Sequence, residues 1–392
     1  MVLPLSYSVR NLANRPTRTL MACGVIALVV AACSLLLALI SSLKRTFVAS
    51  GEPLNLVVIR KGSGNDGSSV LPLAAYRDIR FWDGVARDQT DQPLVSPELV
   101  VQPFFRTNDG GRENVLVRGV EPVALSVHPD VRIAEGRMFR PSSSEAVIGR
   151  GVLGRYRGAT LGSEIEFGHG RWQVVGVMEA GGSSFESEVW VDVRELANDA
   201  KRPWPYSGVR LRAVSAADQS VLQRRINDDP RYAMEAFPEV EYYAKQAESA
   251  NSLYSLVIGI AVLAGVGAGF GAANTMYAAV QARRAEIGTL RALGFSRGAI
   301  LLAFQIEAVT LALLGFAVGA VLAFGGAFLV RWLLGSIAFN SATFTTNVVT
   351  LRLSPADLVL SFVVAVCIGI FGGVGPAWRA AHMRPIEALR KG

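Results

Sequence analysis

The residues with the clearest chemical pattern form a short polar segment between two long apolar runs of the 392-residue sequence. Glu286 and Leu290 stand four residues apart, as do Ile287 and Arg291, so each pair shares one face of a helix. Gly294 follows where a glycine ends a helix. Such a short amphipathic helix suits docking into a groove of a partner protein, although a helix resting on anionic lipid has the same pattern. The predicted contact residues are Arg283, Arg284, Glu286, Ile287, Leu290, Arg291, Leu293 and Gly294.

Two glycine-rich stretches resemble nucleotide-binding loops but lack essential parts of them. Residues 62–69 have the glycine spacing of a phosphate-binding loop, but Ser68 stands where that loop needs a lysine. Gly265, Gly267, Gly269 and Gly271 mimic a dinucleotide fingerprint but lie within an apolar run, without the strand that precedes such a motif. Together with Ala273, Gly265 and Gly269 are expected to let two membrane helices pack closely. We therefore predict no catalytic residue, no nucleotide site and no cofactor on this chain.

Gln305 and Glu307 are polar residues inside an apolar run. Ionisable residues within a membrane span are costly and usually functional. Glu307 lies only about two helical turns inside its span, so we expect it to pair with Arg283, Arg284 or Arg291 rather than to bind a substrate or a proton. The histidines and cysteines are scattered, without metal-ligand spacing, and no metal site is predicted.

Four apolar runs are long enough to cross a membrane as helices. Hydrophobic residues make up 51% of the chain and mean hydropathy is +0.34, and a bilayer core needs about 20 helical residues. The predicted membrane helices are residues 19–43, 252–277, 299–334 and 358–375. The third is longer than a bilayer requires, so it should tilt, break near Gly325 and Gly326, or extend beyond the membrane.

Basic residues predict which segments are cytoplasmic. Arginines cluster before the first run, between the second and third, and after the fourth, whereas the loop at 335–357 carries only Arg352. Residues 1–18 (an interfacial helix), 278–298 and 376–392 are therefore expected on the cytoplasmic side, and residues 44–251 outside. The outer segment is nearly balanced in charge, so the formal net charge of +7 comes from membrane-flanking residues. It does not indicate nucleic-acid binding.

The outer segment reads as mixed α/β. Runs rich in β-branched residues predict strands at 55–60, 114–120, 164–167, 172–178 and 188–192, with a hairpin turn at 168–170. Helices are predicted at 72–82, at 216–227 after a Ser215 cap, and at 240–251, continuing into the second span. Residues 62–69 read as a flexible loop. We expect residues 44–101 and 207–238 together near the membrane, and a strand-rich distal lobe at about 114–196.

The predicted fold class is therefore an α-helical membrane protein with four transmembrane helices and a mixed α/β extracytoplasmic domain inserted between the first and second. The segment at 283–294 resembles the signature of MacB/FtsX-type (type VII) ABC transporter permeases, although Gln281-Ala282-Arg283 stands where that family often has Glu-Arg. Residues 174–192 resemble part of the MacB-type periplasmic core domain. The C-terminal segment is similar to the closing motif of the same family at Pro376, Pro385, Glu387, Leu389 and Arg390.

The resemblance implies a permease subunit of the bacterial inner membrane, whose 283–294 helix contacts a separate ABC ATPase that binds ATP and magnesium. It further implies a second permease copy, identical or different, and a periplasmic adaptor as possible partners besides lipid. The expected function is to transmit ATP-driven change to the outer domain for export. Lipoprotein or lipid extraction, signalling to a periplasmic hydrolase, and a membrane-anchored receptor without an ATPase stay open as alternatives.

Overall fold

The computed structural model describes residues 16–202, 206–334, 337–340 and 346–383. They form two compact units. The first contains residues 1–41, 252–335 and 351–392, and the second contains residues 42–251 and 336–350. The interfacial helix predicted at 1–18 lies almost entirely outside the described residues.

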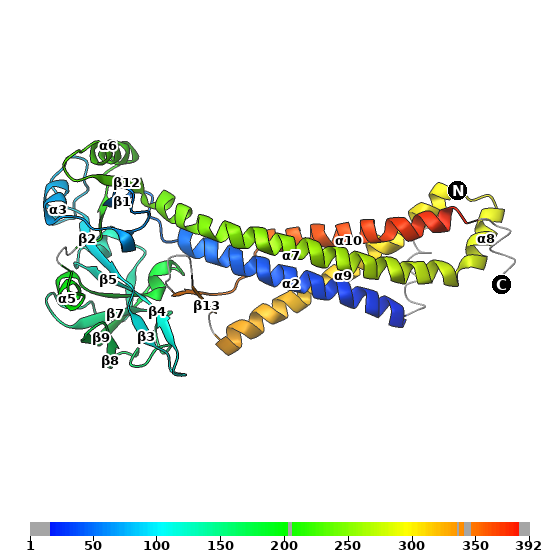
Figure 1. Cartoon of the computed structure of the whole chain (residues 1–392), viewed down its shortest axis with the longest axis horizontal. Coiled ribbons are helices and arrows are strands. Elements are labelled where there is room, and N and C mark those ends of the chain that lie inside the picture. The colour runs from blue at the N-terminus through cyan, green and yellow to red at the C-terminus, as the bar shows by residue number, and fades with distance from the viewer. Residues whose placement is uncertain (1–15, 203–205, 335–336, 341–345, 384–392) are drawn as a thin grey trace. The chain divides into compact units, whose positions relative to one another are not determined.

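Four helices are long and apolar enough to cross a membrane (Figure 1): α2 (Pro16–Val48), α7 (Glu239–Ala282), α9 (Arg297–Leu334) and α10 (Pro355–Ala381). This confirms the number and order of the predicted spans. Of the three alternatives for the long third run, the break near Gly325 and Gly326 does not occur, because α9 is one continuous helix. The helix that contains the last predicted span continues beyond residue 375, through Pro376 to Ala381.

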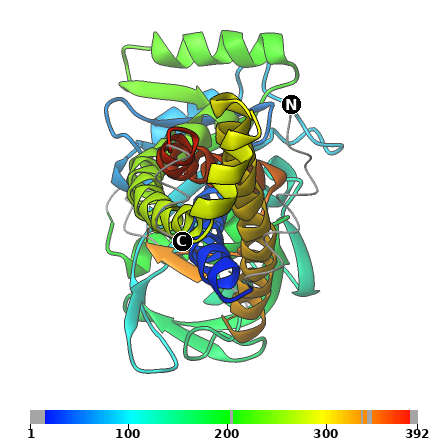
Figure 2. The same cartoon turned by 90° about the vertical axis from the view of Figure 1, so that its right-hand side faces the viewer.

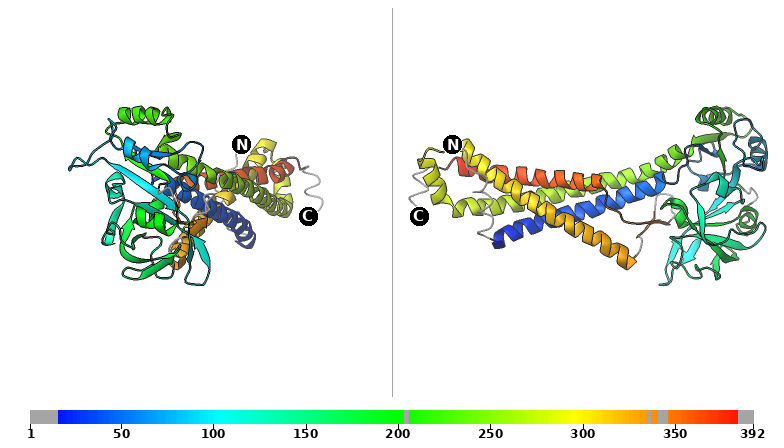
Figure 3. Two further views of the ribbon diagram at one scale, coloured as in Figure 1. Left: turned by 60° about the vertical axis from the view of Figure 1, so that its left-hand side comes forward. Right: turned by 180° about the vertical axis from the view of Figure 1, so that it is seen from behind.

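Small residues let the apolar helices pack closely. A Cβ added to Gly319 would lie 2.7 Å from the Cβ of Val30, so α9 and α2 meet where no larger residue fits. A Cβ on Gly369 would likewise lie 2.7 Å from the Cβ of Ala312, which holds α10 against α9. Figure 2 looks along this bundle, and Figure 3 shows α9 crossing α2 at an angle. Ser34 and Ser361 join α2 to α10 by a buried hydrogen bond of 2.8 Å.

The second unit is built on one ten-stranded mixed sheet in the order β12-β1-β11-β2-β5-β10-β7-β9-β6, with β8 paired to β9. The strands are β1 (Asn55–Arg60), β2 (Val95–Val101), β5 (Leu116–Val120), β6 (Arg132–Gly136), β7 (Glu145–Gly149), β8 (Glu164–Phe167), β9 (Gly170–Glu179), β10 (Glu188–Asp192), β11 (Gly208–Arg212) and β12 (Met234–Pro238). The two predicted lobes are therefore two halves of one sheet, joined where β2 pairs with both β11 and β5.

Alternate residues of the strands enter two cores, one on each face of the sheet. On β1, Leu56 and Val58 belong to one core and Val57 and Ile59 to the other, as the period of two along a strand requires. The first face is covered by α3 (Leu73–Ile79), α5 (Val193–Asp199) and α6 (Ala216–Asn227). The second is covered by α4 (Ala124–Val127) and by the first turns of α7. Ser215 caps α6 as predicted, accepting a hydrogen bond from the backbone N–H of Asp218.

Two segments predicted as loops are built into the sheet domain. Residues 62–69 contain a 3-10 turn, η1 (Asp66–Ser68), whose Asp66 is buried and donates its backbone N–H to the Tyr242 hydroxyl at 2.9 Å. The segment is therefore a loop, as predicted, but its Asp66 is fixed in the sheet domain. Within the predicted loop at 335–357, β13 (Ile337–Asn340) and β14 (Thr346–Val349) form a hairpin. The Val348 N–H donates to the Ser187 hydroxyl of η2 (Ser184–Ser187) at 2.8 Å, so this loop belongs to the second unit. We call the second unit the outer unit, after the location that the sequence predicts for it.

Candidate coupling site

The polar segment between α7 and α9 folds as the predicted short helix, α8 (Arg284–Ala292). Arg283 has φ −113° and ψ 19°, which interrupts the helical backbone and separates α8 from α7. At the other end, Gly294 has φ +93° and the Phe295 N–H donates to the Leu290 carbonyl at 3.1 Å. That is the left-handed glycine ending that the sequence predicts, because a side chain is strained at this φ.

One face of α8 is packed and the other is open. Ile287 is buried against Val280 of α7 and Phe304 of α9, among others in one apolar cluster. Leu290 is half-buried, and Leu293, one turn further on, is 70% exposed. A leucine this exposed beside a half-buried one is the surface expected of a helix that inserts an apolar residue into a partner. Glu286 and Thr289 are also exposed, so the open face has polar groups beside its leucine.

A buried ion pair fastens the start of α8 to α9. Arg283 donates from Nη1 to Glu307 Oε2 at 2.9 Å and from Nη2 to Glu307 Oε1 at 3.2 Å. Both side chains are less than a tenth exposed. This confirms the predicted pairing of Glu307 and selects Arg283 among the three candidates. Arg284 and Arg291 are half-buried on α8, and Arg291 donates to the Phe295 carbonyl at 3.1 Å, closing the end of the helix.

Gln305 joins α9 to α10 rather than facing an open path. Its Nε2 donates to the Ile370 carbonyl at 3.1 Å. Close packing permits this contact, since a Cβ on Gly373 would lie 2.5 Å from the Cβ of Ala308 and 3.1 Å from Gln305 Oε1. The stretch around 369–373 contains two glycines four residues apart, a small-residue pattern that the sequence reasoning overlooked.

The residues predicted to pack α7 closely lie along its contact with α10. The backbone of Gly269 is approached by Gly372, where an added Cβ would lie 2.9 Å from the Gly269 carbonyl oxygen. Gly265 is less constrained, because its own Cβ would make ordinary contacts of 3.8 Å or more. Gly265, Gly269 and Ala273 line an open apolar groove of about 480 Å³ between the two helices, together with Cys367.

The predicted C-terminal motif is described only in part. Pro376 is buried inside α10. The helix runs on beyond it, and Ala377, Ala380 and Ala381 join the apolar cluster that holds Ile287. Pro385, Glu387, Leu389 and Arg390 lie outside the described residues. The described part of the motif therefore contributes to the apolar cluster in which the buried face of α8 packs.

A second set of charged residues, which the sequence reasoning did not find, lies under the first turns of α7 in the outer unit. Arg118 of β5 makes a two-bond ion pair with Glu188 of β10 at 2.7 and 2.6 Å. It also donates to Glu98 of β2 at 2.8 Å and to Asp66 at 3.2 Å. Fully buried guanidinium groups persist only where such partners replace water.

Arg210 of β11 connects these ion pairs to α7. It pairs with Glu98, with Asp66 at 3.1 Å and with Glu239, the first residue of α7, at 3.1 Å. It also donates to the Tyr243 hydroxyl at 3.3 Å. We call Asp66, Glu98, Arg118, Glu188, Arg210 and Glu239 the buried ion cluster. It fixes the start of α7 to the middle of the sheet.

The electrostatics of the cluster favour its ionised form. Burial alone would raise the pKa of the Asp66 and Glu98 carboxyls. The adjacent guanidinium groups of Arg118 and Arg210 overcome this and hold the pKa of both carboxyls below their usual range. Against the effect of burial, Glu188, Glu98 and Asp66 raise the pKa of Arg118 well above its usual value. Glu98 and Asp66 do the same for the pKa of Arg210.

Two protein-family models match this chain. Residues 19–229, more than half of the chain, match the MacB-like periplasmic core domain, and residues 258–385 match the FtsX-like permease C-terminal domain. The chain belongs to the MacB/FtsX-type ABC transporter permease family. The second match includes α8 and both residues of the Arg283–Glu307 pair.

Individual relatives are similar over parts of their length. The macrolide export ATP-binding/permease protein MacB of Rhodopseudomonas palustris is 28% identical over 78% of this chain and 48% of its own. The protein of that type named MacB 1/2 in Paracoccus denitrificans is 30% identical over 60% of this chain and 35% of its own. The chain thus spans less than half the length of these curated relatives. The periplasmic region of MacB from Actinobacillus actinomycetemcomitans covers 48% of this chain at 11% identity, with a TM-score of 0.38.

Proposed function

We propose that this permease transmits the conformational change of a separate ABC ATPase from α8 to the outer unit, and that the outer unit uses it to export a substrate. The observation that carries the proposal is the two-sided construction of α8. One side is locked to the bundle through Ile287 and the Arg283–Glu307 pair, and the other exposes Leu293. Because α8 is bonded to α9 and packed against α7, a displacement of α8 by a docked partner is transmitted to both helices.

A single helix leads from this site to the outer unit. α7 has 44 residues, about 66 Å at 1.5 Å per residue. It ends at Ala282, next to Arg283, and it begins at Glu239, inside the buried ion cluster. Because α7 joins the coupling helix to the buried ion cluster along the chain, it is the segment best suited to transmit a change between them. In this proposal the α8 end is cytoplasmic and the sheet domain is outside.

The polar groups of the apolar unit favour work outside the membrane over passage through it. Ser41 donates to Asp357 at 2.9 Å, and Gln305 and Glu307 are each tied to a neighbouring helix. These side chains hold helices together and are not left facing an aqueous path. We favour export as the function that this conformational change drives, because the relatives are named for macrolide export.

The proposal requires partners. The ATPase binds the ATP and magnesium, and α8 is its contact. A second copy of this permease completes the membrane part, with lipid around it and an adaptor outside. The open groove between α7 and α10 offers small residues for such a helix–helix contact.

The test uses tagged protein purified from its native membranes in a mild detergent, with an ABC ATPase sought among the chains that co-purify. We expect Leu293→Asp, alone, to reduce ATPase recovery at least about tenfold, because it places a charge in an apolar contact. Thr289→Ala is the matched control, since Thr289 is also exposed on α8 and its hydroxyl bonds only to its own helix. Undiminished recovery and export with Leu293→Asp would refute the coupling role. Absence of any ATPase from the wild-type preparation would refute the proposal as a whole.

A further inference from the structure

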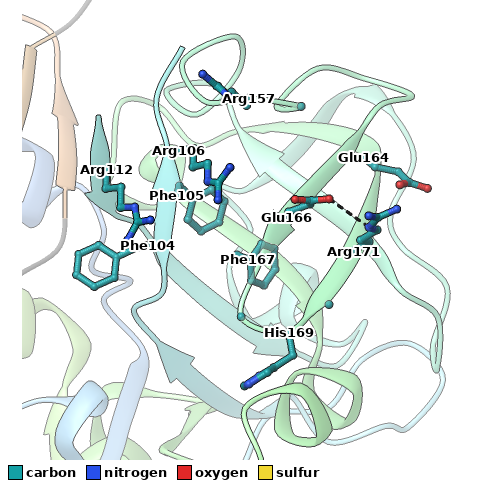
Figure 4. Close-up of a pocket in the computed structure, with 13 residues that line it drawn as sticks. Phe104, Phe105, Arg106, Arg112, Arg157, Glu164, Glu166, Phe167, His169 and Arg171 are labelled. Carbon is teal, nitrogen blue, oxygen red and sulfur yellow. Dashed lines mark ion pairs between the residues drawn. The ribbon is translucent and has the colours of Figure 1, made fainter. Parts of the chain in front are cut away.

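A pocket of about 730 Å³ opens in the outer unit between two hairpins (Figure 4). One hairpin consists of β3 (Phe104–Arg106) and β4 (Arg112–Asn114), and the other consists of β8 and β9, joined at Gly168 to Gly170. Figure 4 shows Arg106, Arg112 and Arg157 on one side of the pocket, with Glu166 and Arg171 on the other. None of the residues that line this pocket belongs to α8 or to the buried ion cluster.

Two of these arginines face each other in an arrangement that a hairpin normally avoids. Arg106 and Arg112 are directly opposite in the register of β3 and β4, and like charges at such positions are destabilising. The Arg157 N–H donates to the Arg106 carbonyl at 3.0 Å, which brings a third arginine alongside. In the part of the chain that the structure describes, none of these three guanidinium groups has an ion pair or hydrogen bond.

The carboxylates close to the pocket are engaged elsewhere. Glu113, between Arg112 and Asn114 on β4, accepts hydrogen bonds from Arg155 at 3.2 Å and from the Tyr156 hydroxyl at 2.8 Å. Glu166 pairs with Arg171 at 3.1 Å. Of the charged residues lining the pocket, Arg106, Arg112, Arg157 and Arg171 outnumber Glu164 and Glu166 by two. The pocket therefore has a surplus of positive charge, in a segment whose overall charge is nearly balanced.

The pocket also has an aromatic surface. Phe105 and Phe167 are buried and stacked, with ring centroids 5.0 Å apart, and both line the pocket. Phe104 lines it as well and is 64% exposed. Arginine forks recognise carboxylate, sulfonate-like and phosphate groups, and aromatic rings accept the apolar body of a ligand. A pocket of this size accommodates a compact organic molecule.

We propose that this pocket binds an organic polyanion with an aromatic or other flat apolar body. Two or more anionic groups lie on Arg106, Arg112 and Arg157, and the apolar body lies against Phe104. Binding relieves the repulsion between Arg106 and Arg112, so the ligand also stabilises the β3–β4 hairpin. This inference does not depend on the proposed coupling function.

The test is an equilibrium titration of the full chain, in nanodiscs of zwitterionic phospholipid, with pyrene-1,3,6,8-tetrasulfonate followed by fluorescence anisotropy. The tetrasulfonate is water-soluble and does not enter the lipid. We expect saturable binding that weakens at least about tenfold in Arg106→Gln/Arg112→Gln, since charged hydrogen bonds are lost. The matched control is Arg87→Gln/Arg132→Gln, which removes two exposed arginines outside the pocket and changes net charge equally. Equal affinity in the two double variants, or no saturable binding to the wild type at low salt, would overturn the proposal.

Two further variants separate the parts of the argument. Arg112→Glu places an opposite charge across from Arg106, so it should abolish binding while leaving the melting temperature unchanged or higher; a lower melting temperature would contradict the repulsion argument. Phe104→Ala should weaken the tetrasulfonate but not inorganic pyrophosphate, measured by competition. If pyrophosphate competes as strongly as the tetrasulfonate, the pocket recognises charge alone and the apolar part of the proposal is wrong.

Discussion

The Arg283–Glu307 pair yields the sharpest prediction for the coupling site. Glu307→Gln removes the negative charge while keeping the shape of the side chain, and leaves the buried Arg283 guanidinium without a counter-charge. Both groups are less than a tenth exposed and share two hydrogen bonds, at 2.9 and 3.2 Å. Breaking a buried pair of this kind by changing one partner costs about 3–5 kcal/mol. Because the substituted amide retains one possible acceptor oxygen, we expect the lower end, about 3 kcal/mol.

The cost should appear as local opening of α8 rather than as global unfolding. Trypsin cleaves after arginine, and α8 and its start contain Arg283, Arg284 and Arg291. When opening is fast, the cleavage rate follows the population of the open form. A loss of about 3 kcal/mol therefore raises the rate at these sites about a hundredfold. The assay is limited proteolysis of the full chain in nanodiscs, with fragments sized by mass spectrometry.

A double variant distinguishes the ion pair from general disruption. Arg283→Met/Glu307→Met removes both charges and refills the space with apolar atoms, a replacement that is often neutral in buried sites. We expect cleavage at Arg284 and Arg291 to return to within about tenfold of the wild-type rate, although α8 is no longer bonded to α9. If Glu307→Gln changes cleavage less than about threefold, or if the double variant is more sensitive than the single one, the reasoning fails.

Three other predictions concern packing, pH and assembly. Gly373→Ala should lower the thermal midpoint, at a cost of about 1–3 kcal/mol, because its Cβ would lie 2.5 Å from another Cβ, whereas Gly265→Ala should change it little. The outer unit should lose resistance to urea as the pH falls below the usual pKa values of 3.8 and 4.5, because the folded-state pKa of Asp66 and Glu98 is lower. In a variant lacking the other two cysteines, the exposed Cys367 should form a disulfide-linked dimer under mild oxidation.

Each has an outcome that would count against it. Equal thermal midpoints for the two glycine variants would show that α10 can move away from α9 at no cost. For the carboxyls, the stabilisation is present above their unfolded pKa and is lost as the pH falls through the folded one. Tryptophan fluorescence that gives the same urea midpoint at pH 7 and pH 3 would show that Asp66 and Glu98 are not held ionised. A monomeric Cys367 variant under oxidation would leave the groove between α7 and α10 facing lipid.

The features that the sequence predicted well are those set by local pattern. Uninterrupted apolar runs identified all four long helices, and β-branched runs identified β1 and β10 with their full bounds. The stop at Gly294 and the Ser215 cap follow from the chemistry of single residues, so they needed no knowledge of distant contacts. Even the pairing of Glu307 followed from one helical distance and a nearby set of arginines.

The buried ion cluster could not be predicted from the sequence, because its members are far apart along the chain. Arg118 and Glu188 are 70 residues apart, and Arg210 and Glu98 are 112 apart. Nothing in the spacing of single charged residues marks them as buried. A weak signal was present for Arg118, which stands inside a run of β-branched or apolar residues where a surface strand would alternate, but Arg210 stands in an ordinary alternating pattern. Charged residues at core positions of strands require buried partners.

The location of the buried ion cluster at the start of α7 also has a physical explanation. A helix that only needed to be anchored could have been held by apolar packing, which costs less to build than four buried carboxylates and two guanidinium groups. Directional bonds fix the position and rotation of a helix more narrowly than apolar contacts alone do. If α7 transmits force, its two ends should be held by bonds of this kind. They are, by Glu239 with Arg210 at one end and by Arg283 with Glu307 just beyond the other.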